Sequence, residues 1–122
     1  MHRMPKALDR LRQLEPWSVV LCTPAAAEIH YGLANLVPGS KRRRLLEDEF
    51  RLFRGAVRWV DWDEDAARIF GTLKAGLRAK GTPIDDLDIA IASIALTLGA
   101  SVATTNARHF NRIEGLTVED WA

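Results

Sequence analysis

Apolar positions divide this chain into helical and extended segments. The spacing of apolar residues and the flanking cap and turn residues predict helices over residues 5–15, 23–36, 40–54, 63–80 and 87–98. Four shorter runs, at 17–22, 57–62, 101–105 and 116–119, are typical of strands. Strands that alternate with helices favour an α/β layer fold with a mainly parallel sheet.

Cap residues set the expected helix ends. Thr23 is predicted to cap the second helix, with Pro24 at its first position, and Ser40 to cap the third. Asp63 is expected to begin the fourth helix, and Gly99 to stop the fifth. These signals predict where each helix begins or ends.

Size and composition are those of a soluble globular domain. The 122 residues, 48% hydrophobic and 27% charged, predict a single domain over residues 1–122. No apolar run is long enough for a membrane span, and the N-terminus lacks the apolar region of a signal peptide. The single cysteine, Cys22, cannot form an internal disulfide, so a cytoplasmic location is expected.

Basic residues are concentrated in one block although the net charge is only +1. The block consists of Lys41, Arg42, Arg43 and Arg44. Taken alone, it is typical of a solvated helix face. The alternative is a patch that binds the phosphates of a polyanion such as RNA.

Three carboxylates, Asp85, Asp86 and Asp88, stand where the apolar helix of residues 87–98 begins. The strand after that helix ends in Thr-Thr-Asn, with Asn106 last. Oxygen ligands of this kind suit Mg²⁺ or Mn²⁺, and ligands of parallel sheets bind at the carboxyl ends of the strands. Helix capping is the alternative explanation for each acid taken singly.

Three segments resemble the PIN-domain family and, within it, the VapC toxins of type II toxin–antitoxin modules. They are AAAEIHYGLA around Glu28, GTPIDDLDIAIAS around Asp88, and SVATTNARHF followed by IEGLTVEDW. The resemblance covers roughly residues 18–122. It implies a PIN-like three-layer sandwich, with a mainly parallel sheet flanked by helices. It also implies a Mg²⁺- or Mn²⁺-dependent endoribonuclease that hydrolyses RNA, forms a homodimer and is blocked by a cognate antitoxin.

The resemblance assigns roles to individual residues. Glu28 and Asp88 match metal-binding acids, and Asn106, supported by Thr104, matches the polar residue that orients water or a ligand. Asp85 and Asp86 fall where some members carry an extra metal-binding acid. The basic block 41–44 is expected to hold RNA phosphates.

Two departures from the family pattern bear on activity. Members usually begin with a strand that ends in an aspartate, and Asp9 cannot replace it because it lies within the predicted helix KALDRLRQ. The first strand and its acid are therefore expected to be missing, as in an N-terminally truncated domain. The alternative function is a catalytically impaired PIN-domain remnant that binds an antitoxin or dimerises. The second departure is His109, which stands where the family often has an acid.

Overall fold

The computed structural model describes residues 10–11 and 13–122. The predicted helix over residues 5–15 therefore falls largely outside the described residues. The chain divides into two compact units, Met1–Val60 and Asp61–Ala122. The prediction that residues 1–122 form a single domain stays a prediction, and each unit is described by itself.

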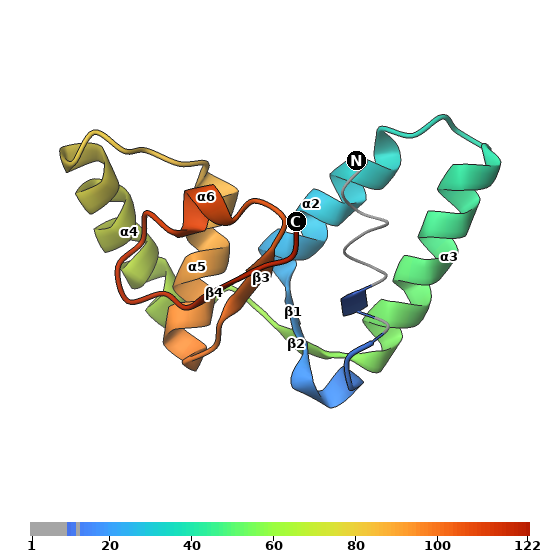
Figure 1. Ribbon diagram of the computed structural model, residues 1–122, viewed down its shortest axis with the longest axis horizontal. Coiled ribbons are helices and arrows are strands. Elements are labelled where there is room, and N and C mark those ends of the chain that lie inside the picture. The colour runs from blue at the N-terminus through green and yellow to red at the C-terminus, as the bar shows by residue number, and fades with distance from the viewer. Residues whose placement is uncertain (1–9, 12) are drawn as a thin grey trace. The chain divides into compact units, whose positions relative to one another are not determined.

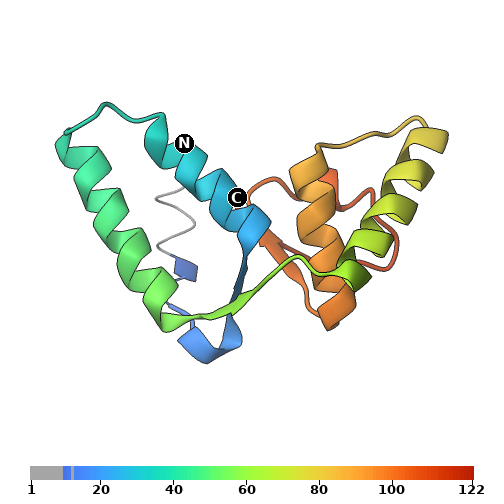
Figure 2. The ribbon, with the colours of Figure 1, turned by 180° about the vertical axis from the view of Figure 1, so that it is seen from behind.

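The first unit joins two parallel strands through two helices. A 3₁₀ turn, Pro16–Ser18, precedes strand β1 (Val20–Cys22), helices α2 (Thr23–Ala34) and α3 (Lys41–Ala56), and strand β2 (Arg58–Val60). Val20 lies opposite Arg58 and Cys22 opposite Val60. Figures 1 and 2 show α2 continuing directly from β1, and β2 following α3. A parallel pair needs such a crossover because a tight turn cannot return the chain in the same direction.

Apolar side chains from both helices and both ends of the crossover form the core of this unit. Its buried members are Leu21, Leu33, Leu46, Phe50 and Val57. Phe50 is only 3% exposed, and the His30 ring contacts it edge to face at 5.3 Å between ring centroids.

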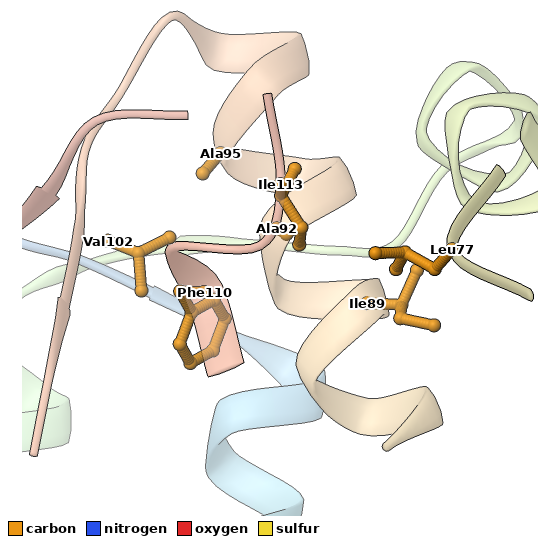
Figure 3. Close-up of a cluster of buried hydrophobic side chains, with 7 residues drawn as sticks. All are labelled: Leu77, Ile89, Ala92, Ala95, Val102, Phe110 and Ile113. Atoms are coloured by element: carbon orange, nitrogen blue, oxygen red, sulfur yellow. The ribbon is translucent and has the colours of Figure 1, made fainter. Parts of the chain in front are cut away.

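The second unit packs two helices beside a second parallel pair. It contains α4 (Glu64–Ala79), α5 (Asp86–Leu98), β3 (Val102–Thr104), α6 (Ala107–Phe110) and β4 (Val118–Asp120). Val102 lies opposite Val118 and Thr104 opposite Asp120. Figure 3 shows the core, in which side chains of α5 meet others from α4, β3, α6 and the following loop. Its buried members are Leu77, Ile89, Ala92, Ala95, Val102, Phe110 and Ile113.

Most helix boundaries follow the predicted caps. Ser40 Oγ accepts a hydrogen bond from the Arg43 backbone N–H at 3.1 Å, and Asp63 Oδ1 accepts one from the Ala66 N–H at 2.9 Å. Gly99 ends α5 with a φ of 67°, in the left-handed region that glycine enters at little cost. The prediction for α2 is wrong by one residue, because Cys22 occupies the cap position and Thr23 is already helical.

The strands are parallel, as predicted, but shorter than expected. Within the described residues they form two pairs, β1–β2 and β3–β4, rather than one continuous sheet. Trp17 and Ser18, predicted to be extended, lie in the 3₁₀ turn, and the short helix α6 was not predicted. In the described part of the chain, no helix combines the length and apolarity needed to cross a membrane.

Candidate metal-binding site

Asp88 is the buried acid of the second unit. It is the third residue of α5 and only 7% exposed, and it is followed by the buried residues Ile89 and Ala90. Because α5 is apolar on most of its circumference and packs against α4, β3 and α6, even its first turn is partly enclosed. A carboxylate in such a place requires a compensating partner.

A chain of polar contacts links Asp88 to the end of β3. Asp88 Oδ2 lies 3.1 Å from His109 Nδ1, and the same nitrogen lies 2.9 Å from Asn106 Nδ2. The Asn106 backbone N–H donates to Thr104 Oγ1 at 2.9 Å. Helix α6, which carries His109, lies beside the first turns of α5 (Figure 1). The structure therefore brings Asp88 and Asn106 together, and it does so through a histidine.

Two residues of this cluster, Asp88 and Asn106, carry oxygen atoms of a kind that a small divalent cation accepts. The contact of the buried Asp88 with His109 uses Oδ2 of its carboxylate. Carboxylate and amide oxygens are hard ligands that Mg²⁺ and Mn²⁺ accept. However, no three side chains of His, Cys, Asp or Glu gather closely enough to hold a metal in the described part of the chain. Asp88 and His109 are two such groups, and a further acid would complete the set.

Asp85 and Asp86 are exposed, unlike Asp88. Asp85 stands at the cap position of α5, but its side chain makes no capping hydrogen bond, contrary to the capping interpretation. Asp86 forms an ion pair with Lys74, with 3.0 Å between Oδ1 and Nζ. Their place as auxiliary metal ligands stays a prediction.

Glu28 lies on α2 of the first unit, and its side chain is exposed. The buried residues of α2 are Pro24, Ala26, Gly32 and Leu33. Because Glu28 belongs to the first unit and Asp88 to the second, their meeting at one cation stays a prediction.

The basic block is mostly free to meet solvent or a ligand, with one exception. Arg43 donates to Glu47 Oε1 at 2.8 Å and to the Leu36 carbonyl at 3.2 Å, which fixes its guanidinium against the protein. Lys41, Arg42 and Arg44 are exposed on the first turn of α3. These three side chains are better placed than Arg43 to contact phosphates.

Cys22 lies buried at the junction of β1 and α2. Burial raises the pKa of its thiol, and the negative charge of Glu28 acts in the same direction. The thiol is therefore a packed, neutral group rather than a nucleophile at neutral pH.

His109 was named in the sequence analysis only as a departure from the family pattern, without a contact to Asp88. The signal was its spacing, because a residue three positions after Asn106 returns to the same side of a helical turn. That spacing becomes informative only once residues 107–110 are known to be helical.

Comparison with known proteins identifies the class. Residues 4–116 match the PIN-domain family. The chain therefore belongs to the PIN-domain family, and its α/β fold with parallel strands agrees with that membership.

Within this family the chain is similar to VapC ribonucleases. It is 35% identical over 92 residues to the tRNA(fMet)-specific endonuclease VapC of Salmonella typhimurium, covering 73% of this chain and 70% of that protein. It is 27% identical over 104 residues to Ribonuclease VapC2 of Rickettsia felis, covering 85% and 75%. It also matches the crystal structure of DNA-bound VapBC from Salmonella typhimurium with a TM-score of 0.78 at 26% identity, covering 99% and 91%. The predicted PIN-like, VapC-like fold is thus confirmed.

Proposed function

We propose that this chain is an endoribonuclease toxin of a type II toxin–antitoxin module that hydrolyses RNA with the help of Mg²⁺ or Mn²⁺. The single observation that supports the metal-dependent part is Asp88, a buried carboxylate at the start of α5 that lies in one cluster with His109 and Asn106. Its relatives named as ribonucleases and endonucleases support the reaction class. A non-catalytic binding module is not favoured by these relatives.

Asp88 would hold the cation through its carboxylate, and Glu28 of the first unit would supply a second acid. Asn106, positioned by Thr104 Oγ1, would orient water or a phosphate oxygen through its side-chain amide. When bound, a divalent cation supplies Lewis acidity that favours ionisation of water and offsets phosphate charge. Enclosure of Asp88 strengthens these electrostatic effects, because water screens them less.

Cationic side chains would hold the RNA backbone. Lys41, Arg42 and Arg44 are exposed near the start of α3. Such side chains bind phosphates and release the counterions that surrounded them, which favours binding. The tRNA named for the Salmonella relative makes tRNA the first substrate to test. Asp85 and Asp86 would act as auxiliary acids.

Assembly and location follow from the same relatives. The VapBC structures that this chain resembles are toxin–antitoxin assemblies, so we propose a cognate antitoxin as its protein partner. We further propose a homodimer and a cytoplasmic location, where RNA is available and a lone cysteine stays reduced.

Cleavage of a tRNA pool by the purified chain, with and without divalent cations, tests the proposal. Asp88→Asn should lower the rate at least about 100-fold because it removes a negative ligand and keeps the hydrogen bond to His109. The matched control is Asp65→Asn, which changes an exposed aspartate in the first turn of α4 and should cleave like the native chain. Cleavage that resists EDTA, or a native rate for Asp88→Asn, would refute the proposal.

A further inference from the structure

Tyr31 is an aromatic residue of the first unit whose side chain is open to solvent. It lies in the last turn of α2 and is 71% exposed, although an aromatic ring gains much from burial when a partner is available. Glu28 stands three residues earlier on the same helix and is exposed as well. Residues three apart on a helix are neighbours, with about 5–6 Å between their Cβ atoms. Tyr31 therefore lies one helical turn from an acid that is proposed to bind the cation.

The basic block 41–44 lies at the same end of the helix pair as Tyr31. Helix α2 ends and α3 begins at this end, and the loop of residues 35–40 joins them (Figure 1). Arg43 donates to the Leu36 carbonyl at 3.2 Å, which ties the start of α3 to the chain that leaves α2. The other members of the block are exposed. This end of the helix pair therefore combines an exposed aromatic ring with exposed cations.

We propose that Tyr31 stacks against an unpaired base of the RNA while the exposed cations of the basic block 41–44 hold its phosphates. The cations match a polyanion, and an aromatic ring beside them offers a surface on which a base stacks. Bases inside a duplex are already stacked on their neighbours, so the ring selects single-stranded RNA or a loop. This inference rests on the proposed RNA substrate and adds the residue that positions a base one turn from Glu28.

Binding of a short dye-labelled single-stranded RNA to the full chain tests this contact. Fluorescence anisotropy in EDTA measures the affinity without cleavage. Tyr31→Ala should weaken binding about tenfold because it removes the stacking surface, whereas Tyr31→Phe keeps the ring and should bind like the native chain. An RNA of the same length with abasic residues offers nothing to stack, so the native chain and Tyr31→Ala should bind it equally.

The matched control is Leu52→Ala, which removes an apolar side chain of similar exposure toward the other end of α3. It should retain the native affinity for both RNAs. Since Tyr31 is exposed, Tyr31→Ala should also keep the native melting temperature, so that a weaker affinity is not caused by unfolding.

Three results would overturn the inference. The first is a native chain that does not bind the intact RNA. The second is equal weakening of Tyr31→Ala on intact and abasic RNA, which would place the contact on the backbone. The third is native RNA affinity of Tyr31→Ala; if sedimentation also shows that this variant no longer dimerises, the ring contacts a second copy of the chain.

The proposed function is judged separately, by cleavage. EDTA-sensitive cleavage that is lost in Asp88→Asn would leave the nuclease proposal standing even if Tyr31→Ala binds RNA like the native chain. Conversely, base-dependent binding through Tyr31 by a chain that cleaves no RNA would support the stacking contact and refute the nuclease proposal.

Discussion

The two units of this protein place their acids in opposite environments. In the first unit, Glu28 is exposed on α2, and the buried positions are apolar or small. In the second unit, Asp88 is buried beside Ile89 and contacts His109. The same family resemblance pointed to both acids, yet only the second stands in surroundings that require a positive partner. Burial, rather than residue type, therefore distinguishes the two acids.

Truncating one core side chain in each unit should have the largest effect, a loss of stability. Phe50→Ala in the first unit and Ile89→Ala in the second should each lower the free energy of unfolding by about 2–5 kcal/mol, because each removes a fully packed side chain. Urea unfolding followed by circular dichroism measures both. Leu52→Ala, at an exposed position of α3, is the control and should change stability by no more than about 0.5 kcal/mol. A loss below about 1 kcal/mol for Ile89→Ala would mean that the core of the second unit is not packed as described.

Replacing Glu28 tests whether the exposed acid of the first unit acts together with Asp88. Glu28→Gln should reduce RNA cleavage about 10- to 100-fold if this acid joins Asp88 at the cation, and should leave the melting temperature unchanged because the side chain is exposed. Single-turnover cleavage rates measure the effect. Asp48→Asn, an exposed acid of the same unit that pairs with Arg51, is the matched control. Native cleavage by Glu28→Gln would confine the chemistry to the second unit.

Replacement of Cys22 should have the smallest effect on stability, and that effect depends on pH. Its thiol pKa is raised in the folded state by burial, so between the unfolded value of about 8.5 and the folded value only the unfolded chain has lost the proton. The resulting stability is complete below about pH 8.5 and is lost as pH rises through the folded pKa. The stability difference between the native chain and Cys22→Ala should therefore fall above that pH in urea titrations. Parallel profiles up to pH 10 would contradict the assigned environment of the thiol.

Local sequence signals predicted much of this fold. Ser40, Asp63 and Gly99 end their helices as expected, because caps depend on neighbours only a few residues away. Strand pairing was less predictable, since three-residue strands form two separate pairs and register depends on distant partners.

The residues of the candidate site also differ in how far the sequence could predict them. Asp88 was recognisable from the family motif, and the structure shows that it is buried. The contact of His109 with Asp88 was not recognisable, because it spans 21 residues and needs the turn of α6. The exposure of Glu28 could not be read from the sequence, because it depends on which other parts of the fold cover α2.

Paramagnetic broadening by Mn²⁺ in an amide NMR spectrum tests most directly whether Asp88 binds a divalent cation. At substoichiometric Mn²⁺, the signals of residues 88, 106 and 109 should disappear first, because their side chains form one cluster. Loss of the Glu28 signal at the same Mn²⁺ concentration would add the acid of the first unit to that site. Sharp signals at 88, 106 and 109 with saturating Mn²⁺ would contradict the account.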